Sequence, residues 1–243
     1  MFEVTLEFKT ENNILPTNLN DVFTSFMKEA TSNYSNDFFN KIFDKANPHL
    51  KLYTFSQYLP GAKFKYDGEE RICISENYFI INFSCYNTID GINFFNSFLK
   101  MKNNKIKIKD NVIILNRVNL KESKEILNEE IIIKMKSPLL VRQHNKEENK
   151  DYYILKNDPS FLETIKDNII AKSKYTKEQY DLNKFSIIPL DTKNVVINSF
   201  GRKVIGTIGV FKLTGDPKLL TLLYSAGIGS ACGNGFGKFE VLA

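Results

Sequence analysis

Glycines are crowded into one short stretch of the chain, and this stretch constrains the fold more than any other feature. In GIGSACGNGFGKFEVL (Gly227–Leu242) they occupy five positions: Gly227, Gly229, Gly233, Gly235 and Gly237. Glycine has no Cβ atom, so it adopts positive φ angles easily and lets a second backbone or a phosphate approach closely. An apolar run with helical spacing precedes the stretch and a short apolar segment follows it. The pattern predicts a loop from a helix into a strand, in contact with a backbone or a phosphate.

A dinucleotide-binding loop is the obvious alternative for a glycine-rich stretch. Such a loop follows a strand, opens a helix and is followed by an acidic residue about 20 positions later. In this chain the helical run comes before the glycines and the strand comes after them. The order argues against a dinucleotide, and we expect the protein to need no cofactor.

Length and charge set wider bounds. The 243 residues suit one large domain or two small ones, and 42% hydrophobic with 25% charged residues is ordinary for a globular protein. The formal net charge is +5 at pH 7. This modest excess permits an anionic partner but does not require one, since such a charge also serves solubility.

The cysteines and histidines give no metal-binding pattern. Cys73, Cys85 and Cys232 are widely spaced, and only His49 and His144 could join them, so no zinc-ligand spacing exists. We expect reduced cysteines and no metal. No apolar stretch approaches the roughly 18–20 residues that span a bilayer, and the N-terminal residues alternate like a strand rather than a signal peptide. The sequence therefore predicts a cytoplasmic protein without a membrane partner.

The first half of the chain alternates between strand and helix patterns. The expected elements are a strand at Phe2–Phe8, a helical region at Asn20–Asp44 that breaks near Ser32–Ser35, strands at Lys51–Gln57, Arg71–Ser75 and Tyr78–Tyr86, a helix at Ile89–Met101 with Ile92, Phe95, Phe98 and Leu99 at helical spacing, and strand segments at Ile106–Ile108 and Val112–Val118. This is the order β-α-β-β-α-β, which is typical of a ferredoxin-like unit.

The second half repeats that order. Its expected elements are one or two strands in Ile131–Val141, a helix with Phe161, Leu162, Ile165, Ile169 and Ile170 facing inward, strands at Phe185–Leu190, Val195–Asn198 and Lys203–Leu213, a helix at Asp216–Ala226, and a last strand at Phe239–Leu242. We therefore predict an α+β protein of two tandem ferredoxin-like (RRM-like) domains, residues 1–122 and 123–243, joined near Asn119–Glu130.

Four segments resemble one known family. They are the glycine-rich stretch, LKLYTFSQ at Leu50–Gln57, the run from KSPLLVRQ to DNIIAKSKY at Lys136–Tyr175, and the strand and helix at Gly201–Ser230. These segments are similar to segments of the CRISPR-associated endoribonucleases that cut repeat RNA, members of the repeat-associated RNA-binding superfamily. Along the chain they occur in the same order as in that family. The resemblance covers both halves of the chain.

The resemblance implies an activity and its partners. It implies metal-independent cleavage of CRISPR precursor RNA within the repeats by attack of a 2′-hydroxyl, which leaves a 5′-hydroxyl and a cyclic phosphate. The partners it implies are the precursor RNA, the mature crRNA and subunits of a Cas effector complex, for a protein that is a monomer or a homodimer.

Three residues are the candidates for catalysis. His49 lies in the connection where the family carries its catalytic histidine, and histidine alone titrates near neutral pH without tuning. Lys51 matches the lysine that opens the family's strand at this place, and it could neutralise charge on the scissile phosphate. Tyr34 could orient or protonate, or could be a packing residue. Only one residue separates His49 from Lys51, fewer than is usual in the family, so Lys45 is a substitute for Lys51.

Other polar residues have competing interpretations. His144 lies in a polar run that predicts an exposed hairpin tip and is the rival histidine. Lys105, Lys107 and Lys109 share one face of a strand, where protection of a sheet edge is the simpler role. The resemblance implies RNA contacts for a larger set: Lys45, Arg202, Lys203, Gly227, Gly229, Ser230, Gly233, Gly235 and Gly237. A hairpin turn with solvated charges explains Arg202 and Lys203 equally well.

Two other functions stay open at this stage. A non-catalytic relative would hold repeat RNA or serve as a subunit of a CRISPR effector complex. A small-molecule enzyme on a ferredoxin-like scaffold is the third possibility, because a fold does not fix a function.

Overall fold

The computed structural model describes residues 1–243 except 45–49, 67 and 146. The chain forms two compact units of mixed α and β structure. Unit 1 consists of Met1–His49, Ser56–Ser123 and Asn198–Gly201, and unit 2 of Leu50–Phe55, Lys124–Ile197 and Arg202–Ala243. The division is therefore not a single cut, because each half of the chain gives a short segment to the unit formed by the other half.

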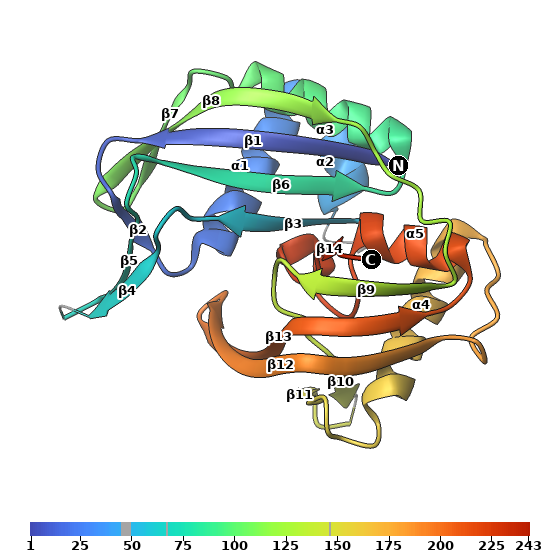
Figure 1. Ribbon diagram of the computed structural model, residues 1–243. Helices are drawn as coiled ribbons and strands as arrows, with labels where there is room; N and C mark the ends of the chain where they lie inside the picture. The colour runs from blue at the N-terminus through green and yellow to red at the C-terminus, as the bar shows by residue number, and fades with distance from the viewer. Residues whose placement is uncertain (45–49, 67, 146) are drawn as a thin grey trace. The chain divides into compact units, whose positions relative to one another are not determined.

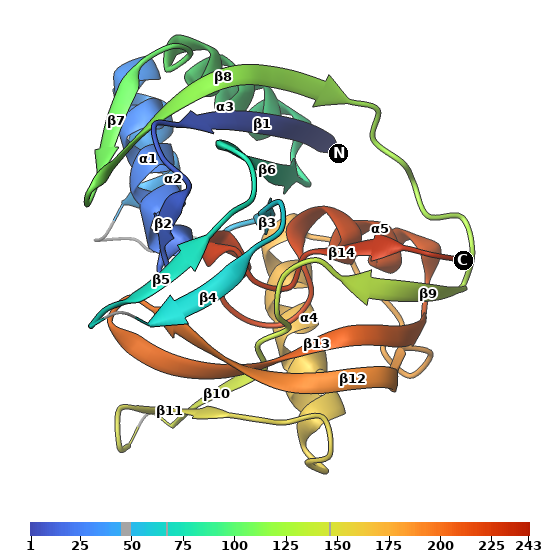
Figure 2. The same cartoon turned by 60° about the vertical axis from the view of Figure 1, so that its left-hand side comes forward.

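Unit 1 contains the first β-α-β-β-α-β order with additions. In chain order the elements are β1 (Phe2–Thr10), β2 (Ile14–Pro16), α1 (Leu19–Tyr34), α2 (Asn36–Phe43), β3 (Tyr53–Tyr58, of which Tyr53–Phe55 are counted with unit 2), β4 (Lys63–Tyr66), β5 (Glu70–Cys73), β6 (Tyr78–Cys85), α3 (Thr88–Lys100), β7 (Lys105–Ile108) and β8 (Asn111–Lys121). The main sheet has the order β3-β6-β1-β8-β7, and β1 pairs antiparallel with β6 and β8. The helices lie on one face of this sheet (Figures 1 and 2). A central first strand between the third and the last is the ferredoxin-like arrangement.

Local sequence explains the main elements of unit 1. Every second residue of β1 from Phe2 to Phe8 is buried, as expected for a strand with one face on a core. The helical region breaks at Ser35, which adopts an extended conformation with φ of −160°. The Ser35 hydroxyl accepts a hydrogen bond from the Phe38 amide at 3.2 Å and so caps α2.

The core of unit 1 is a cluster of phenylalanine rings from the sheet and the helices. The members in ring contact include Phe8, Phe23, Phe26, Phe79, Phe83, Phe94 and Phe98. Offset and edge-on rings of this kind add attraction beyond the area they bury.

The buried face of α3 differs from the expected one. Ile92 and Leu99 are 46% and 43% exposed, whereas Phe94 is fully buried. The reason is Gly91, because a Cβ atom there would lie 2.3 Å from Cβ of Phe2. The helix therefore lays its glycine against the sheet, and the residues three and seven positions further along face the core. In the small sheet β2-β5-β4, only β5 corresponds to an expected strand, the one predicted at Arg71–Ser75.

Unit 2 repeats the fold. Its elements are β9 (Glu130–Met135), β10 (Arg142–Asn145), β11 (Lys150–Tyr153), α4 (Phe161–Thr176), β12 (Ser186–Ser199), β13 (Arg202–Thr214), α5 (Pro217–Ala226), a 3₁₀ turn at Cys232–Asn234 and β14 (Phe239–Val241). The sheet order is β12-β13-β9-β14, again with the first strand between the third and the last, and β10 and β11 form a separate hairpin. The predicted tandem ferredoxin-like fold is confirmed.

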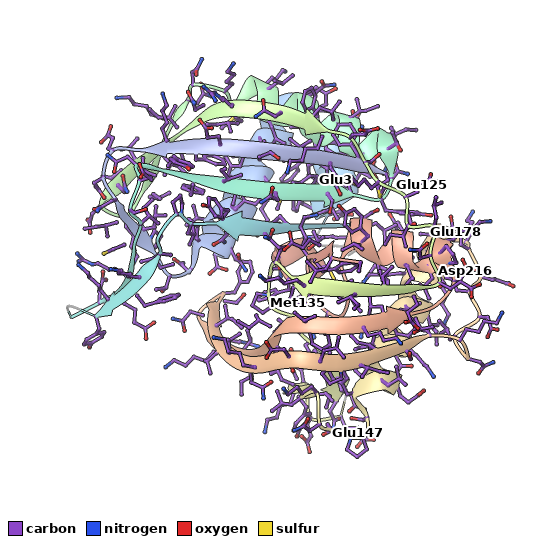
Figure 3. All side chains as sticks on the ribbon, in the orientation of Figure 1. Glu3, Glu125, Met135, Glu147, Glu178 and Asp216 are labelled. Atoms are coloured by element: carbon purple, nitrogen blue, oxygen red, sulfur yellow. The ribbon has the colours of Figure 1, made fainter. Side chains whose placement is uncertain are left out.

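Two details of unit 2 were predicted wrongly. A single strand, β12, replaces the two strands expected at Phe185–Leu190 and Val195–Asn198. Ile170 on α4 is 39% exposed rather than inward. The start of α5 is as expected, since the Asp216 carboxylate accepts from the Lys218 amide at 2.8 Å and Pro217 occupies the first turn (Figure 3 labels Asp216). In the described part of the chain no helix is long and apolar enough to cross a membrane.

Candidate nucleic-acid interface

The glycine-rich segment forms a buried loop between α5 and β14. Gly237 has φ of +71°, and a Cβ atom there would lie 2.0 Å from the carbonyl oxygen of Ile228. Gly229 has φ of +82°, and its Cβ would lie 2.4 Å from the carbonyl oxygen of Leu140. At both positions the backbone approaches another part of the same unit as closely as glycine alone allows. The predicted contact of the glycines with a backbone is present, and that backbone is the protein's own.

Lys51 lies against this loop. A Cβ atom on Gly233 would be 2.7 Å from Cδ and 2.9 Å from Cβ of Lys51, so the lysine stem crosses the loop where glycine leaves room. Three residues further along, the Thr54 hydroxyl donates to the Phe236 carbonyl at 2.8 Å. The candidate phosphate-binding cation and the glycine-rich loop are therefore packed on each other within unit 2.

A buried lysine holds the loop from the other side. Lys172 is 2% exposed, and its ammonium group donates to the carbonyl oxygen of Gly227 at 2.7 Å and to that of Gly229 at 3.4 Å. The sulfur of Cys232 lies 3.7 Å from the same nitrogen. A buried cation needs such acceptors to offset the loss of water. Lys172 thus fixes the entrance of the loop.

The sequence reasoning missed Lys172, although a signal existed. Phe161, Ile165 and Ile169 form the buried stripe of α4, and Lys172 continues that stripe at helical spacing. A lysine on an apolar stripe is either turned to the surface by its long stem or paired inside. Only the position of the glycine-rich loop decides between the two.

Ser230 connects the loop to two other elements. Its amide donates to the Leu140 carbonyl at 2.7 Å, and its hydroxyl accepts from the Arg142 amide at 3.1 Å. The same hydroxyl donates to the side-chain oxygen of Asn168 on α4 at 3.1 Å. Ser230 therefore anchors the start of the β10–β11 hairpin to the loop.

His144 lies on that hairpin, which extends into solvent as expected from its polar sequence; Figure 3 labels Glu147 near its outer end. Nδ1 of His144 lies 2.9 Å from one carboxylate oxygen of Asp151, and Arg142 donates to the other at 3.1 Å. The hydrogen bond with His144 and the nearby charge of Arg142 lower the pKa of Asp151 below its ordinary value. His144 is thus bonded to a carboxylate on an exposed surface.

Arg202 and Lys203 are exposed at the start of β13. Burial raises the pKa of Tyr153 and the charge of Asp151 raises it further, whereas the positive charges of Arg142 and Arg202 act in the opposite direction. Both arginines therefore lie close enough to Tyr153 to act on it electrostatically.

Tyr34 is the last residue of α1 in unit 1. Its hydroxyl lies 3.5 Å from the side-chain oxygen of Asn93 and 3.4 Å from the amide nitrogen of Asn96, both on α3. The ammonium group of Lys100 lies 5.5 Å from the centre of its ring. Tyr34 therefore has polar partners within its own unit. Lys45 and His49 lie outside the described residues.

The lysines at 105, 107 and 109 lie on or beside β7, which is the edge strand expected from them. Lys105 is 3.9 Å from a carboxylate oxygen of Glu11, and Lys109 is 3.7 Å from one of Glu69. Exposed lysines on an edge strand discourage pairing with another chain. Among the residues that the structure describes, no group of three histidine, cysteine or acidic side chains could hold a metal ion.

Two ferredoxin-like units in tandem, with a buried glycine-rich loop before the last strand, make this a protein of the tandem ferredoxin-like fold class. The chain belongs to the Cas6 family, because residues 120–241 match the family described as CRISPR associated protein Cas6, C-terminal. The suspected family is thereby confirmed. No curated protein sequence matches the chain.

Solved structures share the fold at low identity. One described as an RAMP protein binding different RNA substrates has a TM-score of 0.85 at 20% identity and covers 100% of both chains. The product of a Cas6-related gene from Pyrococcus furiosus has a TM-score of 0.85 at 19% identity, with 99% of this chain and 98% of that chain covered. A CRISPR associated protein Cas6 has a TM-score of 0.77 at 20% identity, with 100% and 99% covered. At these identities the likeness shows the fold alone.

Proposed function

We propose that this protein binds CRISPR repeat RNA and cuts it without a metal, by attack of a 2′-hydroxyl on the adjacent phosphate. Membership of the Cas6 family supports the substrate. The observation that carries the proposal is the packing of Lys51 across Gly233, because it holds a cation beside a backbone loop. A fixed cation stabilises the charge that develops on a phosphate during displacement.

The proton transfers are assigned to His49. The 2′-hydroxyl must lose a proton and the 5′-oxygen must gain one, and a histidine does both near neutral pH. Lys51, with Lys45 as its substitute, neutralises the scissile phosphate. Tyr34 orients or protonates the leaving group. These roles rest on the positions of the residues in the sequence. In addition, the bound protein aligns the 2′-hydroxyl with the phosphate for in-line attack.

Unit 2 binds the RNA through contacts with the sugar-phosphate backbone of the RNA. Arg202 and Lys203 are exposed and suit phosphates. Ser230 and the glycine-rich loop (Gly227, Gly229, Gly233, Gly235 and Gly237) complete this surface. Gly229 and Gly237 contribute by fixing the conformation of the buried loop. Ala231 and Asn234, which are partly exposed, are the loop residues that can contact the RNA.

Cleavage of a labelled repeat RNA in excess EDTA tests the proposal. We expect one cut, and none in a repeat with a 2′-deoxy sugar at the cut site, because the nucleophile is then missing. His49→Ala should slow single-turnover cleavage by roughly 10²–10⁴-fold with little change in affinity. Full activity of His49→Ala, or loss of cleavage on chelation, would reject the mechanism.

Two further variants separate the roles. Lys51→Ala should lower both the rate and the affinity, because it contacts the phosphate before and during the reaction. His144→Ala is the matched histidine control and should stay within a few fold of the parent rate, since His144 is exposed on the hairpin.

A non-catalytic repeat-RNA-binding protein is the second candidate. The single residue between His49 and Lys51 favours it, because this spacing is shorter than the family's. Tight binding of repeat RNA without product, unchanged in His49→Ala, is the result that would select it.

A further inference from the structure

Strand β4 presents two aromatic rings to solvent. Phe64 is 79% exposed and Tyr66 is 78% exposed, more than any other aromatic side chain in the described residues. They stand two positions apart on one strand, so they point to the same side. Their spacing along the strand is about 6.8 Å, from a rise of about 3.4 Å per residue.

The exposed rings continue a buried row. Leu15, Ile72 and Phe64 are opposite one another on β2, β5 and β4 and so share one face of the small sheet. Their exposed fractions are 1%, 4% and 79%. The apolar face thus leaves the core of unit 1 at β4, the outer strand of the small sheet (Figure 2). An apolar face that runs out into solvent marks a place where something docks.

Basic residues alternate with these rings along β4, so they project from the other face of this outer strand. Lys63 and Lys65 alternate with them on β4 and are exposed, and neither is in an ion pair within the described residues. The two acidic residues at the start of the neighbouring strand β5 are already engaged. Glu69 lies 3.7 Å from Arg71 and 3.7 Å from Lys109. Glu70 accepts a hydrogen bond from Asn198 at 2.6 Å. The two lysines therefore remain available to an anionic partner.

We infer that β4 is a stacking platform for single-stranded RNA, with one base against Phe64, one against Tyr66 and the phosphates along the free edge of β4, where the long side chains of Lys63 and Lys65 approach them from the other face. Flat aromatic rings interleaved with lysines are what non-sequence-specific single-strand binding requires, since every base has a π face and every nucleotide a charge. The platform rests on the proposed function and extends it to the unpaired nucleotides beside the cut repeat. It consists of residues of unit 1, whereas the glycine-rich loop belongs to unit 2.

A single tryptophan tests the stacking directly, because the chain contains none. Phe64→Trp should lose fluorescence when an oligouridylate of about 12 nucleotides is added, since a stacked base quenches the indole. Leu127→Trp is the matched control, because Leu127 is also 79% exposed but lies in the segment between β8 and β9 that is neither strand nor helix. Quenching in the first variant and not in the second is the expected result. Equal quenching in both would overturn the platform.

Affinity provides the second measurement. Phe64→Ala and Tyr66→Ala should each weaken oligouridylate binding by roughly 5- to 100-fold. Tyr58→Ala, a 51% exposed tyrosine in the same unit, should change it less than about twofold. Lys63→Ala with Lys65→Ala should weaken binding and flatten its dependence on salt. Both aromatic positions are mostly exposed, so unchanged melting temperatures verify that the variants fold.

The same protein preparations separate the possible failures. If the parent binds and cuts repeat RNA but the β4 variants leave oligouridylate binding unchanged, the platform is wrong and the proposed function stands. If the parent binds no RNA of either kind, both are wrong. If Phe64→Ala instead turns a dimer into a monomer in sedimentation while RNA affinity is unchanged, β4 is a protein contact, and the platform is rejected.

Discussion

The connection from the second helix to the last strand of the sheet is exposed in unit 1 and buried in unit 2. In each, the chain runs from the second helix of the fold to the last strand of the sheet. In unit 1 this connection passes through the exposed edge strand β7, with lysines at 105 and 107. In unit 2 it is the buried glycine-rich loop, held by Lys172 and crossed by Lys51. Because unit 1 reaches the same topology without these glycines, the loop serves something that the fold alone does not need.

The cores differ as well. Unit 1 is filled by phenylalanine rings, three of which touch Phe98 within about 6 Å between ring centres. Unit 2 is filled mainly by isoleucine and leucine from α4, α5 and the sheet. Rings fill space in few large pieces, whereas the aliphatic core leaves room for a backbone loop beside it. The same fold is thus packed by aromatic rings in unit 1 and by aliphatic side chains beside a buried loop in unit 2.

The largest expected effect lies in the ring cluster. Phe98→Ala should lower the free energy of unfolding by about 3–5 kcal/mol, because it leaves a cavity among rings that cannot collapse. Urea denaturation measures the loss, and Phe98→Leu should recover much of it. A loss below about 1 kcal/mol would mean that the rings do not carry the stability of unit 1.

The next effect tests the loop. Gly237→Ala should cost about 2–4 kcal/mol, because its Cβ meets a carbonyl oxygen and its φ is positive. Gly68→Ala in unit 1 is the control, since Gly68 also has a positive φ of +75° but nothing within 4 Å of the added atom. It should cost only about 1–2 kcal/mol. Equal costs would show that the close approach in unit 2 does not matter.

These positions also mark how far the sequence could predict the fold. The order of elements and the break at Ser35 followed from local patterns of apolar and polar residues. The face of α3 was predicted correctly for Phe98, which is fully buried, but wrongly for Ile92 and Leu99, which are apolar in sequence but exposed. Their apolar character alone does not say which side meets the sheet, and Gly91 decides it through contact with Phe2, far away in the chain.

Removal of the buried ammonium group should have a smaller effect. Lys172→Met takes a donor from two buried carbonyl oxygens and should cost about 1–3 kcal/mol. Lys174→Met, exposed on the same helix, should stay within about 0.5 kcal/mol of the parent. An unchanged stability of Lys172→Met would show that the loop keeps its conformation without the cation.

The candidate site was predictable only in part, for a related reason. The glycines and the exposed hairpin of His144 could be found from local sequence patterns, and Lys51 from the resemblance to the family. Lys172 could not, since its carbonyl partner is 55 residues away. The platform on β4 was missed because four residues are too few to show a strand period, and its partner β5 had to be in place first.

Thiol labelling compares the two interiors without any change of fold. Burial raises the pKa of the Cys85 thiol to about 12. The thiol therefore stays protonated and unreactive from neutral pH up to about pH 9. The half-buried Cys73 should react first with a disulfide reagent, and Cys85 only on unfolding. In Lys172→Met the label should reach Cys232 faster and Cys85 at the parent rate. Faster labelling of both would mean that the loop is not opened selectively.

The smallest effect concerns the β10–β11 hairpin, which lies between the first strand and the first helix of unit 2. The folded pKa of Asp151 is lowered, so its carboxylate adds stability above the unfolded pKa of about 3.9, and this is lost as the pH falls through the folded value. Because the pair is exposed, solvent screening keeps the gain below about 1 kcal/mol. Asp151→Asn should be slightly less stable than the parent near pH 6 and equal to it near pH 2. A difference that persists in acid would contradict the assignment.

The discontinuity of unit 2 has a consequence for synthesis on the ribosome. The hydroxyl of Thr54 donates to the carbonyl of Phe236, and 182 residues separate the two. At about 5–20 residues per second, translation delivers Phe236 on the order of 10–40 s after Thr54. Throughout that interval the segment Leu50–Phe55 exists without the unit it belongs to. Unit 2 therefore combines a segment made early with a segment made late. It can be completed only after the glycine-rich loop has left the ribosome.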